Sequence, residues 1–161
     1  MFRKMAISLD PIDVQLLAEL QTDADRPNVE LARLVGLSPA ATLNRVRRLK
    51  ESGVLRRISA QLDSTAAGFP LQVYVLVTLA RDDEVMNRRF EEAVVAFPQV
   101  IAADWVTGEV SGVLMVVSRD VAELQQVLTR LSRRGASRLV TLLRLAELKP
   151  SSPLPLEPTR G

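Results

Sequence analysis

The chain has 161 residues, 47% of them hydrophobic and 25% charged, and its formal net charge is +2. This length suits one large domain or two small ones, and the composition is that of a folded soluble protein rather than a disordered one. Because the sequence contains no cysteine and no histidine, it has neither disulfides nor the commonest general base and metal ligand, and we expect no metal and no cofactor.

No segment of the sequence predicts export or membrane insertion. The first residues, MFRKMAISLDPID, have no apolar core of the length that a signal peptide needs. The longest apolar run, LQVYVLVTLA, is far shorter than the stretch of about 20 residues that crosses a bilayer as a helix. We therefore expect a cytoplasmic protein that does not contact a membrane.

Two short helices are predicted near the start of the chain. Asp10 can act as the N-cap of the first helix, with Pro11 at its first position, and apolar residues repeat at helical spacing as far as Leu20. Asn28 can cap a second, shorter helix, which Gly36 is placed to end. A tight turn after Gly36 then leads into the next helix.

The third helix has the clearest start signal. Ser38 and Pro39 repeat the N-cap and first-position pattern, and the helix is expected to run to about Ser52, with Gly53 ending it. The following segment, 54–70, is predicted to contain a short strand, VLRRI, and then a connection. Three short helices with a tight turn between the second and third make a helix-turn-helix, and the strand after them would be its wing.

The second half of the chain alternates strand and helix patterns in the order β-α-β-β-α-β, which is the ferredoxin-like arrangement. The predicted elements are strands at 71–79, 100–106, 112–117 and 138–148 and helices at 84–97 and 121–134. The predicted fold class is therefore α+β. The predicted domains are a winged helix-turn-helix domain at 8–58, a connecting segment at 59–70, a ferredoxin-like βαββαβ domain at 71–148 and a disordered tail at 149–161.

Helical geometry divides the third helix into two faces, since successive residues are about 100° apart. The face predicted to pack on the first two helices carries Thr42, Leu43, Val46 and Leu49. The other face begins with small residues and continues with an amide and guanidinium groups: Ala40, Ala41, Asn44, Arg47 and Arg48, with Arg45 at the flank. Small residues let a helix approach base edges closely, while Asn can pair with adenine and Arg with guanine or phosphate.

The charge around this helix indicates nucleic acid as the partner. Residues 38–58 carry six basic side chains and one acidic side chain, a local net charge of +5 within a chain of net charge +2. A basic helix face alone could be a solvated surface, but here it follows a tight turn and a capped start, as in DNA-binding proteins. The predicted partner is double-stranded DNA, and the predicted contacts are Ser38, Ala40, Ala41, Asn44, Arg45, Arg47 and Arg48.

These segments resemble the Lrp/AsnC, or feast/famine, family of bacterial and archaeal transcription regulators. The most specific part is NVELARLVGLSPAATLNRVRRLKESGVL, and the resemblance continues through TGEVSGVLMVV over roughly residues 8–148. It implies a sequence-specific DNA-binding transcription regulator that works as a homodimer or a higher oligomer, commonly an octamer. It also implies that the C-terminal domain dimerises and, as in many members, senses an amino acid or a related small molecule.

The predicted hairpin loop, TGEVSG, departs from the family's pattern. Members of the family commonly have an Asp where this chain has Ser111, so a ligand's ammonium group would lack that carboxylate partner, and the chain binds either a different ligand or none. The loop glycines can equally serve turn geometry alone, and the one tryptophan can be a core residue. The residues predicted for an effector site are Trp105, Thr107, Gly108 and Ser111.

Two alternatives to a DNA-binding regulator remain. The segment GVLRRISAQLDSTAAGFP is also similar to sirohaem decarboxylases, which share both domains, but those enzymes are expected to use histidines and this chain has none. Thr107 and Ser111 have no histidine or cysteine partner, and no Gly-rich phosphate loop is present, so we predict no catalytic residue and no enzyme activity. The other alternative is an interaction module that pairs with a related regulator.

Overall fold

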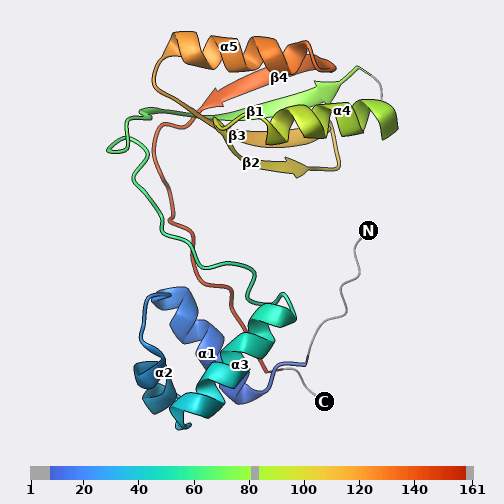
Figure 1. Cartoon of the computed structure of the whole chain (residues 1–161). Helices are drawn as coiled ribbons and strands as arrows, with labels where there is room; N and C mark the ends of the chain where they lie inside the picture. The colour runs from blue at the N-terminus through green and yellow to red at the C-terminus, as the bar shows by residue number, and fades with distance from the viewer. Residues whose placement is uncertain (1–7, 81–83, 159–161) are drawn as a thin grey trace. The chain divides into compact units, whose positions relative to one another are not determined.

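The computed structural model describes residues 8–80 and 84–158 of the chain. The chain forms two compact units: residues 1–60 together with 149–161, and residues 61–148 (Figure 1). The polypeptide therefore passes from the first unit to the second and back again.

The N-terminal unit contains the three predicted helices, α1 (Pro11–Thr22), α2 (Asn28–Leu34) and α3 (Pro39–Glu51). Isolated helices of this length are marginal in water, so each of the three is stabilised by burying its apolar side against the others. The buried cluster consists of Leu16, Leu20, Leu31 and Val35, and partly buried Ile12, Leu37, Val46 and Leu55 pack around it.

The start of α2 and the segment after α3 differ from the prediction. Pro27, not Asn28, takes the N-cap position, and the Asn28 side-chain amide instead donates a 2.9 Å hydrogen bond to the carbonyl oxygen of Pro39. Residues 54–70 contain turns but neither helix nor strand, so the expected wing strand VLRRI does not form. An extended segment needs a neighbouring strand for its backbone groups, and the described chain supplies none beside Arg56 and Arg57.

The C-terminal unit has the predicted element order and confirms the α+β class. Its elements are β1 (Leu71–Leu79), α4 (Glu84–Val95), β2 (Val100–Trp105), β3 (Gly112–Ser118), α5 (Val121–Ser132) and β4 (Ala136–Leu143). The strands form one sheet in the order β2-β3-β1-β4, and each neighbouring pair is antiparallel. The predicted range of the last strand, 138–148, is wrong at both ends, because pairing with β1 begins at Ala136 and ends at Leu143.

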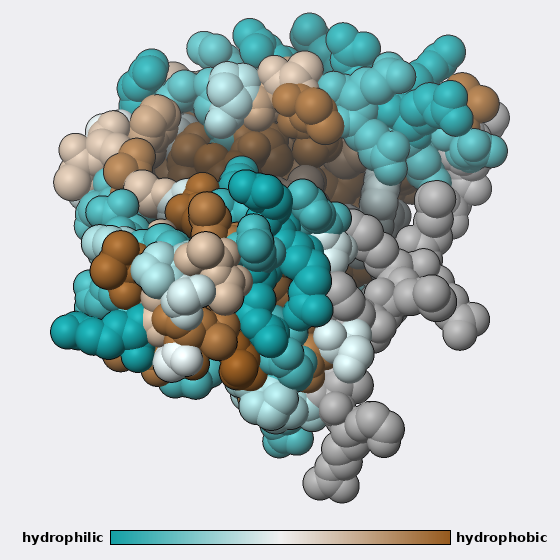
Figure 2. Space-filling model, turned by 60° about the horizontal axis from the view of Figure 1, so that its bottom comes forward, coloured by the Kyte–Doolittle hydropathy of each residue, from teal (hydrophilic) through white to brown (hydrophobic). Residues whose placement is uncertain are grey.

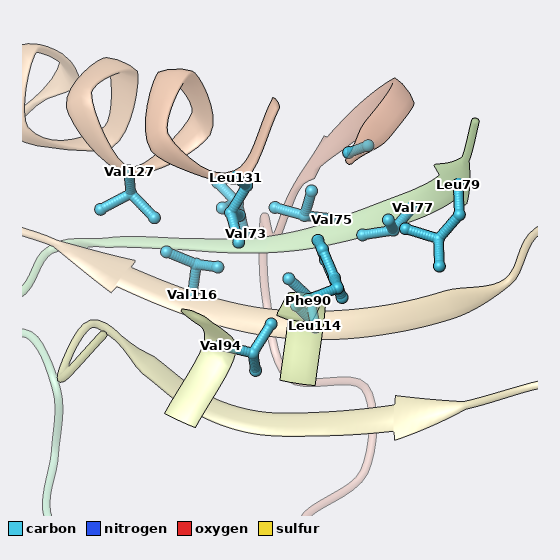
Figure 3. Close-up of a cluster of buried hydrophobic side chains, with 11 residues drawn as sticks. Val73, Val75, Val77, Leu79, Phe90, Val94, Leu114, Val116, Val127 and Leu131 are labelled. Carbon is cyan, nitrogen blue, oxygen red and sulfur yellow. The ribbon is translucent and has the colours of Figure 1, made fainter. Parts of the chain in front are cut away.

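Both helices of this unit cover the same face of the sheet. Alternate residues of β1 point toward them, and Phe90 and Val94 from α4 and Val127 and Leu131 from α5 belong to one buried cluster on that face (Figure 3). The opposite face has an apolar centre, and two of its side chains, Tyr74 and Leu142, are 38% and 47% exposed. The strand register also places Leu76, Val113, Met115 and Val140 on this face, with the polar residues Gln72, Thr78 and Arg138 beside them.

Hydrophobic side chains thus reach the surface as well as the core, and Figure 2 shows them in brown among hydrophilic residues in teal.

The C-terminal tail, predicted to be disordered, contains no helix or strand within residues 149–158. It nevertheless joins the N-terminal unit, because the backbone N–H of Leu154 donates to Gln21 Oε1 at 2.7 Å and Gln21 Nε2 donates back to the Leu154 carbonyl at 3.4 Å.

Candidate functional site

A glycine turn sets the direction of α3 relative to α2. Gly36 has a φ of 67°, a conformation that side chains disfavour, and the N–H of Leu37 donates to the carbonyl of Ala32 at 2.9 Å. Ser38 then caps α3, because its Oγ accepts a 3.2 Å hydrogen bond from the N–H of Ala41. The predicted turn and helix start are therefore confirmed.

The buried side of α3 is narrower than the sequence suggested. Thr42 and Leu49 have no exposed surface, whereas Leu43, predicted to face inward, is 48% exposed. Thr42 and Leu49 are two turns apart on one line, and Leu43 lies about 100° around the helix from Thr42, which turns it toward the solvent. The exposed face of α3 thus carries Ala40, Leu43, Asn44 and Arg47.

Two of the three arginines of α3 are bound to carboxylates at the start of α1, those of its N-cap Asp10 and of Asp13 in its first turn. Arg45 Nη1 lies 2.5 Å from Asp10 Oδ2 and 3.0 Å from Asp13 Oδ1. Arg48 Nη2 donates to the other oxygen of Asp13, Oδ2. Asp13 is wholly buried, so its negative charge is compensated inside the unit by these two guanidiniums.

The two aspartates also cap α1, which fixes their carboxylates beside α3. Asp10 Oδ1 accepts from the N–H of Asp13 at 2.8 Å, and Asp13 Oδ2 accepts from the N–H of Asp10 at 3.3 Å, which is a reciprocal capping box. The hydrogen bond from Arg45, aided by the Asp13 backbone N–H, holds the pKa of Asp10 below its usual value. The same bond to Asp10 raises the pKa of Arg45.

This pairing lowers the positive charge that the sequence predicts for the surface around α3. The predicted local charge of +5 counts Arg45 and Arg48 as free cations, although two carboxylates from more than 30 residues away neutralise much of their charge. Arg47 is exposed and has no ion-pair partner among the residues that the structure describes. Sequence reasoning missed Asp13, whose only signal was its place three residues after the N-cap Asp10.

The predicted DNA contacts therefore fall into separate groups. Ser38 and Ala41 belong to the capped first turn, where backbone N–H groups are available, and Ala41 is half-buried. Ala40, Asn44 and Arg47 share the exposed face of α3. The side chains of Arg45 and Arg48 lie at its edge, 29% and 51% exposed, in contact with α1.

A cavity of about 250 Å³ lies in the C-terminal unit between α4 and the strands β2 and β3. Its walls are mostly apolar, and Trp105 and Phe90 meet there with their ring centres 5.9 Å apart. Glu91 and Asp104 are the two acidic residues that line it, and Trp105 Nε1 donates a 2.7 Å hydrogen bond to the carboxylate oxygen Oε1 of Glu91. The cavity can therefore accept an apolar group together with a hydrogen-bond donor or a cation.

The other residues predicted for an effector site do not line this cavity. The N–H of Ser111 donates to the Val77 carbonyl at 2.8 Å, and its Oγ accepts from the N–H of Leu79 at 3.3 Å. Ser111 thus anchors the hairpin loop to β1. Thr107 and Gly108 are exposed in that loop, and Gly108 has a φ of 127°, which a turn can require without any ligand.

No helix within residues 8–80 and 84–158 is long and apolar enough to cross a membrane. In the same described ranges, no group of three or more acidic side chains is arranged to hold a metal ion.

Comparisons with protein families match both units. The AsnC-type helix-turn-helix domain family matches residues 9–50, and the Lrp/AsnC ligand binding domain family matches residues 72–154. The chain is 37% identical over 119 residues to the leucine-responsive regulatory protein of Rhizobium meliloti, covering 74% of this chain and 76% of that protein. It is 32% identical to the protein of the same name from Haemophilus influenzae, and the match covers 98% of this chain and 96% of that protein.

Solved structures agree with this match. A transcriptional regulator from Neisseria meningitidis in complex with L-Met has a TM-score of 0.84 and 29% identity, covering 92% of this chain and 97% of that one. An AsnC family regulator from Agrobacterium tumefaciens has a TM-score of 0.82 and 28% identity, and the match covers 91% of this chain and 97% of that one. The chain therefore belongs to the Lrp/AsnC family of transcriptional regulators, with an N-terminal helix-turn-helix DNA-binding domain and a C-terminal ligand-binding domain.

Proposed function

We propose that this regulator reads DNA with the exposed face of α3, through Ala40, Asn44 and Arg47. The single observation that carries the proposal is Arg47, an exposed arginine with no ion-pair partner among the described residues, on the same face as an amide and a small residue. Asn pairs bidentately with adenine and Arg with guanine, each worth about 1–3 kcal/mol of discrimination, and alanine lets the helix approach the bases. The capped first turn, with Ser38 and Ala41, is suited to hold a backbone phosphate.

A single α3 helix reads only a few base pairs, so we propose that two copies act together as a homodimer. The support is the sheet face opposite α4 and α5, where Tyr74 and Leu142 expose apolar surface that a second copy can cover. A two-fold dimer places its two helices about one turn of DNA apart and favours palindromic half-sites. Assembly beyond the dimer, to an octamer, remains a prediction from the family resemblance.

The test of the DNA-reading face uses two arginine variants. The DNA probe is the duplex that the wild-type chain selects from a randomised library. Arg47→Ala is expected to weaken binding to that duplex by about 1–3 kcal/mol if Arg47 contacts a base. Arg89→Ala is the control, since Arg89 is an exposed arginine on α4 in the other unit. Equal binding by both variants and the wild type would contradict the assignment of α3 as the reading helix.

We further propose that the cavity beside Trp105 takes the effector, an amino acid or a similar small amine. The support is its apolar wall and the Glu91 carboxylate, which has acceptor sites beyond the one that Trp105 uses. A structural relative was solved with L-Met bound, which makes L-methionine a suitable first probe. A ligand regulates DNA binding only if it favours one arrangement of the protein over another.

The proposed function does not include catalysis. The relatives named above are transcriptional regulators, and we predict that this chain has no decarboxylase activity toward sirohaem derivatives. Mixing the purified chain with those derivatives and following their absorbance tests this prediction, since turnover would contradict it.

A further inference from the structure

Asp13 is the most unusual side chain of the DNA-binding unit. It is a carboxylate without exposed surface in a small helical domain, where buried acidic groups are rare unless they are paired. It accepts hydrogen bonds from Arg45, Arg48 and the N–H of Asp10, so each of its oxygens is engaged. Its two charged partners both come from α3, the proposed reading helix.

The position of these arginines matters for DNA binding. Free guanidiniums at the edge of a reading helix attract phosphates of any sequence, and such contacts raise non-specific affinity more than they raise discrimination. Arg45 and Arg48 are instead drawn toward α1, and Arg45 also contacts Asp10 at 2.5 Å. The exposed face keeps Asn44 and Arg47, whose side chains suit base edges.

We infer that Asp13 is a positioning residue that sets sequence selectivity, by holding Arg45 and Arg48 against α1 and away from DNA phosphates. This inference rests on the proposed DNA reading by α3 and adds a role to a residue that touches no DNA. Asp13 acts in two ways. It orients α3 on α1, and it keeps Arg48, and together with Asp10 also Arg45, from the phosphate contacts that do not depend on DNA sequence.

The main variant is Asp13→Asn, which keeps the size of the side chain and removes its charge. Binding is measured to the selected duplex and to a scrambled duplex at several salt concentrations. Each additional phosphate contact steepens the plot of log affinity against log salt by about 0.9. Asp10 still holds Arg45 in this variant, so the release of Arg48 alone steepens the plot by about 0.9 per helix. We expect this steeper slope, tighter binding to scrambled DNA, and a smaller ratio of selected to scrambled affinity.

Two further variants separate this role from a purely structural one. Asp25→Asn removes one negative charge from an exposed residue of the same unit without touching α3, and it should leave the slope and the affinity ratio as in the wild type. The triple variant Asp13→Asn, Arg45→Gln, Arg48→Gln removes the carboxylate and both cations together. It should return the slope to the wild-type value, and it tests the inference even if Asp13→Asn alone does not fold.

The inference is overturned if Asp13→Asn keeps the wild-type slope and weakens binding to both duplexes by the same factor. It is also overturned if the triple variant has a slope shallower than wild type by about 1.8, because the arginines would then contact phosphates in the native protein. Failure of the proposed function is distinguishable from both results: the wild-type chain would show no preference for any selected duplex over the scrambled one, and the inference would fall with it.

Discussion

Arg48 of α3 donates a hydrogen bond to Asp13 of α1, a carboxylate that has no exposed surface. Arg47, the next residue back along the helix, has no ion-pair partner among the described residues and is exposed. Neighbouring arginines on one helix therefore have different roles: one helps to fasten the helix to the domain, and the other remains available to DNA. The count of basic residues does not distinguish these roles, whereas their angular position around the helix does.

Leu43 and Leu49 offer a matched pair of leucines on the same helix. Leu49 is fully buried, so Leu49→Ala should lower the free energy of unfolding by about 2–5 kcal/mol. Leu43 is 48% exposed, so Leu43→Ala should change stability by less than about 0.5 kcal/mol. Because an exposed apolar group can contact a thymine methyl, Leu43→Ala should instead weaken binding to the selected duplex. Urea unfolding and DNA titration of both variants check this; equal stability losses would contradict the orientation of α3.

Much of the helix-turn-helix could be predicted from sequence because its signals are local. Pro11, Ser38 and Gly36 mark helix ends through the conformation of their own backbone and through bonds to residues a few positions away. The strand β1 was likewise predictable from its continuous apolar run. These features require no knowledge of the tertiary structure.

The parts that sequence could not predict depend on distant residues. The pairing of Arg45 with Asp10 joins positions 35 residues apart, and no local pattern indicates it. The inward prediction for Leu43 failed because hydrophobicity alone does not say how wide the buried stripe of a short helix is. The effector residues were predicted as one loop, whereas Trp105 lines a cavity with α4 and Ser111 is bonded to β1.

Acid should destabilise the N-terminal unit through Asp10. Its pKa is lower in the folded chain than in the unfolded one, because Arg45 and backbone N–H groups bond the charged form. The contribution of Asp10 to stability is therefore complete above the ordinary aspartate pKa of about 3.9 and is lost as the pH falls through the lower, folded value. Asp10→Asn can still cap α1 but cannot ionise, so its free energy of unfolding should decline less than that of the wild type over this acid range.

Urea unfolding of the wild type and Asp10→Asn between about pH 2 and 6 measures this difference. The two stabilities should differ most near pH 6 and converge at the acid end. Parallel curves over the whole range would show that the Asp10–Arg45 pair contributes nothing to the folded state.

The turn between α2 and α3 should require Gly36 because of its backbone conformation, and not because a larger side chain would clash there. Nothing lies within 4 Å of a Cβ placed on Gly36, yet its φ of 67° is unfavourable for a residue with a side chain. Gly36→Ala should therefore destabilise the domain by about 1–2 kcal/mol, and Gly36→Asn by less, since Asn tolerates this conformation better. Thermal unfolding of the three proteins gives the ranking; an alanine variant as stable as wild type would contradict it.

The cavity in the C-terminal unit can be followed by the fluorescence of Trp105, the one tryptophan in the chain. Titration with L-methionine should change the emission, and Glu91→Gln should weaken the binding because it removes the charge that an ammonium group needs. Glu92→Gln is the control, since Glu92 is also on α4 but does not line this cavity. Equal affinities in the two variants would exclude Glu91 as a ligand contact.

The exposed sheet face should carry the contact between copies. Leu142→Asp places a charge among apolar residues of that face and should shift the protein toward the monomer in light scattering. Val121→Asp is a matched control, because Val121 is 69% exposed at the start of α5, on the helical side of the sheet. If both variants keep the mass of the wild type, the copies meet through another surface.

The most direct test of the account is the selection of DNA sites from a randomised duplex library by the wild type, Asn44→Ala and Arg47→Ala. We predict that the wild type converges on a two-fold symmetric sequence. Each variant should lose preference at its own position in each half-site and keep the remaining positions. If both variants select the same sequence as the wild type with the same stringency, the exposed face of α3 does not read DNA.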